Sequence, residues 1–421
     1  MRRIVIVCIS FLLVLAGAAC CLSACSSGGG TSPTDMADVV PSSFEGLAKK
    51  TKAPNYKKSL MATVSLSPAY GRQVLLERYS PQTGEWVAEQ SYTAQDMETS
   101  LVTVDFGQNW KPYASSKWRV RAPAIHDAGP DRETFGEAVA NTKVVNELVS
   151  CRAAAIMDAE SGKLVYASNA TKQRKIASMT KMMSAVLLVE NKKPSDKIKI
   201  TKKIWQTEYS FGFSRGDELT SEQVLYGMML PSANDAAAAA AYGVSGGIKR
   251  FAKLMNAKAK EIGCTNTVFA NPHGLDEAGA HSTALDVARI GRYIMTSDTC
   301  SLVRQAVKTK KYAFDVKVKK TVKKKSKKTG KVKKKTKTIV HAYALTNTNK
   351  LLGGSYNALG IKTGYTEGAG CCFCGAFEVN GKVYVTVVMG ADTDKARWKD
   401  TRTLVKFARY AAEQGFEEFE L

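Results

Sequence analysis

The sequence predicts a multidomain protein in which a small all-β module precedes a larger domain of mixed helices and strands. Its 421 residues suggest two or three domains, at about 150 residues each. Residues 57–123 show strand and turn patterns, whereas later segments also show helical periodicity. The composition, 44% hydrophobic and 24% charged, fits a packed globular protein. Only the N-terminus carries a long apolar run, and no Gly-X-Y repeat or sustained heptad occurs, which excludes polytopic membrane, collagen and coiled-coil classes.

The N-terminus has the pattern of a secretory signal. Arg2 and Arg3 precede an apolar run over residues 4–15, which has the length of a signal-peptide core. The Leu-Ser-Ala-Cys segment that ends at Cys25 looks like a bacterial lipobox, in which the cysteine becomes the lipid-bearing first residue of the mature protein. Cleavage near Ala19 and an uncleaved anchor are the alternatives, and all three place the rest of the chain outside the cytoplasm.

This N-terminal pattern sets the expected location. We expect a lipoprotein signal peptide over residues 1–25, lipidated at Cys25, and a flexible tether over residues 26–56. The protein is then expected in the cell envelope, either secreted or held by its N-terminal lipid at the outer face of the cytoplasmic membrane.

Residues 57–123 are interpreted as a β-sandwich of immunoglobulin or fibronectin type. Residues 74–79 form a β-rich run, and the Pro-Gln-Thr-Gly segment at 81–84 has turn chemistry. Residues 102–106 alternate with period two, as half-buried strands do. We favour a spacer role over carbohydrate binding, because a fold alone does not establish a function. Residues 124–132 are expected to be the linker to a domain over 133–421.

The first of three chemical motifs is Ser178-Met179-Thr180-Lys181. Apolar residues at 179, 182, 183 and 186 follow helical spacing, so Ser178 and Lys181 lie on one helical face, one turn apart. A serine hydroxyl becomes a nucleophile when a base takes its proton, and a lysine amine can be that base if its pKa is lowered by burial.

The second motif is Ser232-Ala233-Asn234, ahead of an alanine-rich helix that begins at Ala236. Ser232 could relay a proton between Lys181 and a leaving amine, and Asn234 could hold a substrate amide. The alternative interpretation is a helix start capped by the Ser or Asn side chain.

The third motif is Lys362-Thr363-Gly364-Tyr365, next to an apolar strand. Lys362 and Thr363 on a strand edge could bind a terminal carboxylate, and Gly364 would leave the edge open to a substrate backbone. The alternative is a surface strand with a solvated lysine.

The order and spacing of the three motifs resemble those of the penicillin-recognising serine hydrolases. The resemblance is closest to the low-molecular-mass D-alanyl-D-alanine carboxypeptidases, serine peptidase family S11, and covers residues 133–415. Four further segments carry it, namely 157–163, 269–275, 347–352 and 360–370. It implies a β-lactamase/transpeptidase-like α/β (α+β) fold, in which helices flank an antiparallel sheet.

The resemblance also implies a reaction. Ser178 would attack the carbonyl between the two terminal D-Ala residues of a peptidoglycan pentapeptide, with Lys181 as general base and Ser232 passing the proton. Backbone N–H groups of Ser178 and Tyr365 would form the oxyanion hole. Water would then hydrolyse the acyl-enzyme, and β-lactam antibiotics would act as covalent inhibitors by acylating the same serine.

The remaining motif residues would bind the substrate. The resemblance implies that Asn234 binds the peptide, that Lys362 and Thr363 bind the terminal carboxylate, and that Gly364 and Tyr365 line the strand edge. It implies no cofactor. His273 could be interpreted as a catalytic histidine. Because Lys181 already supplies the base, we expect a structural role for His273.

Neither the histidines nor the cysteines indicate a metal site. The four histidines show no HExxH spacing, and the Cys-Cys-x-Cys cluster at 371–374 has no second cluster to complete a zinc site. Six cysteines from Cys151 onward permit disulfides outside the cell, but the sequence does not choose a pairing. Small buried thiols are the alternative, above all for Cys264 and Cys300.

Other functions for the same motifs stay open at this point. A class A β-lactamase needs a Glu with a following Asn between the second and third motifs, and only Glu261 and Glu277 lie there, outside such a pattern. Slow deacylation of penicillin is therefore expected. The sequence separates carboxypeptidases poorly from DD-endopeptidases and transpeptidases. A non-enzymatic wall-binding lipoprotein is disfavoured, because binding alone does not need both Lys181 and Lys362.

Residues 308–338 form a lysine-rich insertion. They hold sixteen Lys and one acid, Asp315, and so supply +15 of the net charge of +23. Residues 316–319 alternate and 326–330 are turn-like, which predicts an extended cationic hairpin. It is either a solvated protrusion or an element attracted to anionic wall polymers or lipid head groups. Nucleic acid is not an expected partner outside the cell.

Overall fold

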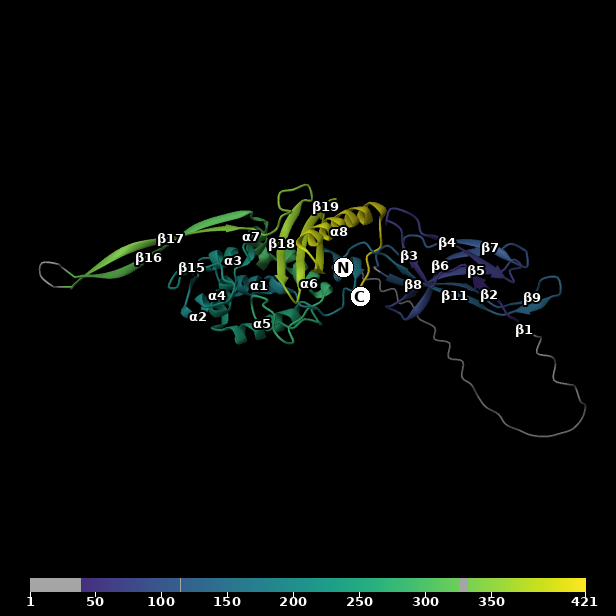
Figure 1. Ribbon diagram of the computed structural model, residues 1–421, viewed down its shortest axis with the longest axis horizontal. Coiled ribbons are helices and arrows are strands. Elements are labelled where there is room, and N and C mark those ends of the chain that lie inside the picture. The colour runs from purple at the N-terminus through teal and green to yellow at the C-terminus, as the bar shows by residue number, and fades with distance from the viewer. Residues whose placement is uncertain (1–38, 114, 326–331) are drawn as a thin grey trace, which may run out of the picture.

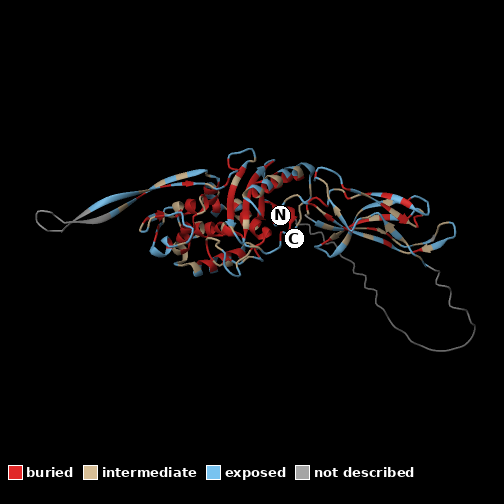
Figure 2. Cartoon of the chain, in the orientation of Figure 1, coloured by how far each residue is buried: buried red, intermediate tan, exposed pale blue. Residues whose placement is uncertain are grey.

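The computed structural model describes residues 39–113, 115–325 and 332–421. The predicted signal peptide and Cys25 lie outside these ranges. The chain is elongated, with a β module at one end, a domain of helices and strands in the middle and a long hairpin at the other end (Figure 1). Buried residues concentrate in the middle domain, whereas the hairpin and the outer strands of the β module are mostly exposed (Figure 2).

Two facing sheets make up the β module. The strands of the module are Ser43–Glu45 (β2), Lys50–Lys52 (β3), Met61–Ser67 (β4), Gln73–Ser80 (β5), Glu85–Thr93 (β6), Ser100–Asp105 (β7), Ser115–Ala122 (β8) and Ala138–Val145 (β11). The sheets have the orders β3-β11-β8-β5-β6 and β2-β4-β7, and only the β3–β11 pair is parallel. Alternate residues turn inward, so that Trp118, Val120 and Ala122 of β8 join one apolar core with Trp110.

The predicted limits of this module, 57 and 123, are wrong. Strands β2 and β3 lie within the predicted tether, and β11 lies within the predicted catalytic domain. β11 pairs with the whole length of β8, from Ala138 opposite Ala122 to Val145 opposite Ser115. The predicted linker instead holds β9 (Ile125–Ala128), which pairs with β10 (Glu133–Phe135), itself next to β1 (Val39–Val40). The proline and glycine residues of this stretch belong to the β9–β10 hairpin, which lies between β8 and β11 in the sequence. They do not mark a break between domains.

The middle domain is built on an antiparallel sheet, as predicted, and this sheet has five strands. Its strands are Ala153–Asp158 (β12), Leu164–Ser168 (β13), Ala358–Thr366 (β18), Gly370–Val379 (β19) and Lys382–Ala391 (β20). Their order is β13-β12-β20-β19-β18, so β18 is an edge strand. The strands are almost wholly apolar, because both faces of the sheet are covered.

Helices cover the two faces of this sheet. They are Lys181–Asn191 (α1), Lys202–Trp205 (α2), Ser221–Met229 (α3), Asn234–Ser245 (α4), Ile248–Glu261 (α5), Ala284–Thr296 (α6), Ser301–Lys308 (α7) and Asp394–Gln414 (α8), with short 3₁₀ turns at Ala177–Thr180 (η1) and Asp298–Cys300 (η2). α6 packs on one face and α8 on the other. The short strands Lys197–Lys199 (β14) and Glu218–Thr220 (β15) pair beside the helices.

The β module contacts the middle domain directly. Tyr56 packs against Phe407 and Tyr410 of α8, with ring centroids 5.2 and 5.1 Å away. Lys111 Nζ donates a hydrogen bond to the Tyr410 hydroxyl at 3.1 Å. The Ala167 amide of β13 donates to the Pro112 carbonyl at 2.9 Å. The predicted tether therefore ends in a buried aromatic contact at Tyr56.

The lysine-rich insertion forms a hairpin, as predicted, and the hairpin is longer than its lysine-rich part. Strands Lys311–Lys325 (β16) and Val332–Thr346 (β17) pair from Lys311 opposite Thr346 to Lys325 opposite Val332. Its root packs into the domain core through Val316, Tyr343 and Leu345. Farther out, the register places lysine opposite lysine at three pairs, 320 with 337, 323 with 334 and 324 with 333.

The six cysteines from Cys151 onward are all free and buried, so the alternative of small buried thiols holds for each of them. None of the helices in the described ranges combines the length and the apolarity that crossing a membrane requires.

Candidate active site

The three motifs meet where the 3₁₀ turn η1, the start of α4 and the edge strand β18 come together. Lys181 Nζ lies 2.9 Å from Ser178 Oγ and 2.7 Å from Asn234 Oδ1. A Cβ atom on Gly364 of β18 would lie 3.1 Å from the Ser178 backbone nitrogen. In the sequence, Asn234 lies more than fifty residues from Ser178 and Gly364 more than one hundred. The fold brings both of them to the turn that carries Ser178 and Lys181.

Lys181 is fully buried and holds its amine among three oxygen acceptors. Besides Ser178 and Asn234, Nζ donates to the His273 carbonyl oxygen at 2.6 Å. Burial, and secondly the nearby Lys362 cation, lower the pKa of Lys181 well below its ordinary value, while Asp235 acts in the opposite direction. An uncharged amine in this position can take the proton of the Ser178 hydroxyl.

A glycine fixes the turn that carries Ser178. Ala177 has a left-handed φ of 48°, and Gly274 has φ +84°. A Cβ on Gly274 would lie 2.0 Å from the Ala177 carbonyl oxygen and 2.8 Å from Thr180 Oγ1, so only glycine fits against this turn. Asn271 shapes the glycine loop, because its Oδ1 accepts from the Gly274 amide at 2.7 Å.

Of the second motif, Asn234 forms a hydrogen bond with the Lys181 amine, whereas Ser232 does not within the described residues. Asn234 Nδ2 donates to the Glu208 carbonyl at 3.0 Å, which fixes the amide. In the described chain, the hydrogen-bond partners of the Lys181 amine do not include Ser232, which has a left-handed φ of 67°. The capping alternative is wrong, since α4 has Ala233 at its N-cap and no side-chain cap hydrogen bond.

The third motif lies on β18 with its lysine buried. Lys362 is 1% exposed, which excludes the alternative of a solvated surface lysine. Burial, together with the neighbouring Arg397, lowers the pKa of Lys362 to about 7. Thr363 Oγ1 lies 2.6 Å from Thr348 Oγ1, and Tyr365 is 64% exposed.

Arg397 of α8 was not predicted from the sequence. Its Nη1 donates to the carbonyl oxygens of Gly364 (3.2 Å) and Cys372 (3.3 Å), so it reaches the back of β18. It also pairs with Asp394, three residues earlier on the helix. In the sequence these two residues look like an ordinary surface ion pair, and no pattern signals that the arginine is buried beneath the third motif.

His273 contacts the site through its backbone. Its carbonyl oxygen binds the Lys181 amine, and burial followed by the Lys181 charge lowers the pKa of its imidazole to about 4. The ring is therefore neutral at neutral pH. Within the described residues, no group of three or more His, Cys, Asp or Glu side chains could hold a metal ion.

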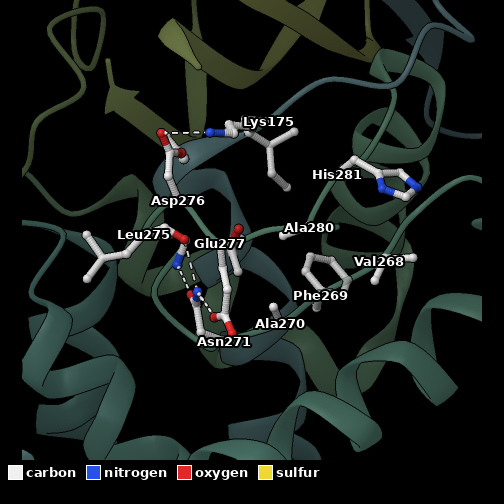
Figure 3. A pocket seen from close by; sticks show the side chains of 14 residues that line it. Lys175, Val268, Phe269, Ala270, Asn271, Leu275, Asp276, Glu277, Ala280 and His281 are labelled. Atoms are coloured by element: carbon white, nitrogen blue, oxygen red, sulfur yellow. Dashed lines mark hydrogen bonds and ion pairs between the residues drawn. The ribbon is translucent and has the colours of Figure 1, made fainter. Parts of the chain in front are cut away.

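A pocket adjoins the η1 turn, since Ala177 and Thr180 are among the residues that line it (Figure 3). It is lined by Lys175, Ile176, Ala177, Thr180, Val268, Phe269, Ala270, Asn271, Gly274, Leu275, Asp276, Glu277, Ala280 and His281. Asp276 forms an ion pair with Lys175 at 3.2 Å and accepts a hydrogen bond from Thr366 Oγ1 at 2.9 Å. Asp276 thereby links the loop that holds Gly274 to the end of β18. Neither Ser178 nor Lys181 lines this pocket.

The model of the D-alanyl-D-alanine carboxypeptidase family, peptidase family S11, matches residues 140–325 and 305–393. The chain belongs to this family. The match includes all three motifs and excludes most of the β module.

Curated relatives and solved structures agree with S11 membership. The chain is 31% identical over 264 residues to D-alanyl-D-alanine carboxypeptidase DacF of Bacillus subtilis, with 61% of each chain covered. It is also 31% identical to the D-alanyl-D-alanine endopeptidase of Escherichia coli, covering 62% of this chain and 77% of that protein. The chain thus spans about three fifths of the length of DacF.

Two solved structures show the same S11 fold. The crystal structure of D-alanyl-D-alanine carboxypeptidase DacD from Francisella tularensis has a TM-score of 0.54 and 26% identity, covering 62% of this chain and 70% of that chain. The Streptomyces K15 DD-transpeptidase has a TM-score of 0.53 and 27% identity, covering 62% and 97%.

We predict that Gly274→Ala destabilises the protein more than a matched glycine substitution does. The new Cβ would overlap the Ala177 carbonyl, which adds about 1–3 kcal/mol of overpacking to the cost of a left-handed φ. Gly263→Ala is the control, because Gly263 has φ +80° with nothing within 4 Å of the added Cβ. Thermal unfolding of the full chain measures both, and equal midpoints for the two variants would contradict the prediction.

Proposed function

We propose that this protein is a serine-type D-Ala-D-Ala carboxypeptidase that removes the terminal D-Ala from peptidoglycan stem peptides. The observation that carries the proposal is the 2.9 Å contact between Ser178 Oγ and the buried amine of Lys181. Membership of the S11 family and the names of the curated relatives support it.

The proposed reaction begins with proton transfer from Ser178 to an uncharged Lys181. Ser178 Oγ then attacks the carbonyl carbon between the two D-Ala residues, and the backbone N–H groups of Ser178 and Tyr365 bind the developing oxyanion. The proton passes to the nitrogen of the departing D-Ala as the peptide bond breaks. We propose Ser232 as its relay, although within the described residues Ser232 makes no hydrogen bond with the Lys181 amine. Water hydrolyses the resulting ester and regenerates the Ser178 hydroxyl.

Substrate binding is assigned to the edge of β18 and the residues around it. An edge strand can accept an extended peptide as a further strand. Gly364 makes room for the Ser178 turn, since a Cβ there would lie 2.9 Å from the Ile176 carbonyl oxygen. Lys362 and Thr363 bind the terminal carboxylate, with the Arg397 cation adding to the positive charge behind the strand. Asn234, fixed by Lys181 and the Glu208 carbonyl, binds the peptide amide.

DD-endopeptidase activity is the second candidate, because the E. coli endopeptidase is as similar in sequence as the carboxypeptidase DacF. A β-lactamase is disfavoured, since both glutamates between the second and third motifs are engaged elsewhere. Glu261 pairs with Lys258, and Glu277 accepts a hydrogen bond from Asn271.

We predict that fluorescent penicillin labels the wild-type chain and leaves Ser178→Ala unlabelled, because the acyl bond forms on Ser178. Ser161→Ala, at an exposed serine, is the control and keeps the label. Release of D-Ala from a pentapeptide, cleavage of a cross-linked dimer and turnover of free penicillin are measured in parallel. D-Ala release supports the carboxypeptidase. Dimer cleavage without D-Ala release would indicate a DD-endopeptidase instead, and rapid penicillin turnover would indicate a β-lactamase.

We predict that kcat/KM for D-Ala release falls as the pH rises above about 7. A lysine loses its charge as the pH passes its pKa, and for Lys362 that value is about 7 in the free enzyme, so the carboxylate loses its cation. Lys362→Arg stays charged and is expected to remove this alkaline fall, at a lower kcat/KM. A wild-type profile that is flat between about pH 6 and pH 9 would contradict the assignment.

We also propose that Cys25 carries a lipid that holds the protein at the outer face of the cytoplasmic membrane. The lipobox-like sequence supports this location, as does a family whose substrates are in the cell envelope. Metabolic labelling with a fatty acid tests it, and label that persists in Cys25→Ala would exclude the assignment.

The N-terminal module is proposed to be an immunoglobulin- or fibronectin-type sandwich that acts as a spacer. The strand orders β11-β8-β5-β6 and β2-β4-β7 around one core support the fold type. An experimental structure of the full chain with a different strand order would exclude it.

The hairpin is proposed to bind anionic wall polymers. Its outer register opposes lysine with lysine, and like charges directly opposite each other destabilise a two-stranded ribbon. A bound polyanion would offset this repulsion. A groove at the hairpin root is lined by Lys197, Lys317 and Lys319 and also by the carboxylates of Glu218 and Asp315, so its lining carries a small positive excess.

We predict that shortening the hairpin lowers salt-sensitive binding to isolated cell walls. Lys319 lies opposite Thr338, so an Asn-Gly turn can replace residues 320–337 and leave the packed root intact. A full-length variant with glutamine for each lysine between 320 and 337 separates charge from length. Sedimentation with walls before and after removal of their anionic polymers is the measurement, and unchanged binding of both variants would exclude the proposal.

A further inference from the structure

A loop over residues 207–217 lies between the root of the hairpin and the start of α4. It has no helix or strand of its own up to β15. The loop contacts the hairpin at one end and Asn234 and Asp235 at the other, so it joins the lysine-rich insertion to the site that holds Ser178.

Side chains of the hairpin hold this loop by hydrogen bonds, two of which involve a buried carboxylate of the loop. The Tyr343 hydroxyl of β17 accepts from the Ser214 amide at 2.8 Å and donates to Asp217 Oδ2 at 2.6 Å. His341 Nδ1 lies 2.7 Å from Asp217 Oδ1. Asp217 is 0% exposed, and its two oxygens thus each meet a side chain of the hairpin.

The other end of the loop fixes the start of α4. The Asp235 carboxylate accepts hydrogen bonds from three successive loop amides, Phe211 (3.2 Å), Gly212 (3.0 Å) and Phe213 (3.1 Å). The next residue back, Asn234, donates to the Glu208 carbonyl and accepts from Lys181. A displacement of the loop would therefore move the acceptor that holds the Lys181 amine.

Aromatic packing limits where the loop can go. The Phe213 ring is fully buried, with its centroid 5.0 Å from that of Tyr343 and 6.4 Å from that of Phe314. On the opposite side α3 presents Gly227, where a Cβ would lie 2.9 Å from the Phe213 ring. The ring therefore packs against both the hairpin root and α3, and a shift of the hairpin root would change its packing.

We infer that Tyr343 and Asp217 are positioning residues for catalysis: through the 207–217 loop, they place Asn234 where it can hold Lys181 against Ser178. The inference rests on the proposed function for its catalytic readout. Neither residue touches Ser178 or Lys181, and neither belongs to the three motifs. The hairpin insertion thereby supplies part of the scaffold of the active site from its root, whatever its lysine-rich end binds.

The test compares Tyr343→Phe and Asp217→Asn with Tyr312→Phe in the full chain. Tyr312 lies on the same hairpin and stacks on Tyr226 at 3.9 Å, and in the described chain its hydroxyl makes no hydrogen bond. Hydrogen–deuterium exchange of residues 211–214 reports the loop without reference to any activity. The rate constant of acylation at saturating fluorescent penicillin, per labelled chain, reports the site.

We expect exchange in residues 211–214 to become about tenfold faster and acylation about tenfold slower in both variants, with Tyr312→Phe like wild type. We expect the labelled fraction to stay unchanged. This fraction is the control for folding, because unfolded chains would lower the total label without changing the rate constant per labelled chain. Exchange within about twofold of wild type in both variants would overturn the inference. Faster exchange with unchanged acylation would overturn the catalytic part of it. A wild-type chain that penicillin does not label would refute the proposed function, and the exchange result would still decide whether Tyr343 and Asp217 hold the loop.

Discussion

The site depends on one arrangement, the burial of the Lys181 amine among acceptors that come from three separate segments. In water a lysine amine is protonated and cannot accept a proton, so the fold must remove water from it to make it a base. Asn234, the His273 carbonyl and Ser178 take over the hydrogen bonds that water would make. Lys362 is a second buried lysine, and after burial its charge is the next cause of the lowered pKa of Lys181.

Close approach of backbones makes this arrangement possible. Gly274 and Gly364 lie against the two sides of the Ser178 turn, each at a distance where a side chain would collide with the turn. The helices behind it pack as tightly, since residues 236–241 of α4 are six buried alanines. Small residues thus bring α1, α4 and β18 close enough for the Lys181 amine to reach Ser178 and Asn234.

The sequence predicts the parts of the fold and the site that have a local pattern. The SxxK, SAN and KTG motifs, the helix after Ser178 and the alternating start of the hairpin all show in residue spacing. The structure brings Ser178, Lys181, Asn234 and the strand that holds Lys362 together, but the hydrogen bonds of the Lys181 amine do not include Ser232. The limits of the β module were missed, because the pairing of β3 and β11 joins residues almost one hundred positions apart. Two further contacts also leave no signal in composition or periodicity. Arg397 looks like an ordinary charge on an amphipathic helix, and the His273 acceptor is a backbone carbonyl.

The long hairpin has a consequence for how copies of this protein behave toward one another. A two-stranded ribbon has a free edge along each strand, and a free edge with unpaired N–H and C=O groups is a template on which another chain can add a strand. Two ribbons approaching edge to edge would each bring a dense row of like charge, so their mutual repulsion opposes intermolecular sheet growth. The same lysines therefore oppose strand addition at the exposed edges of this ribbon.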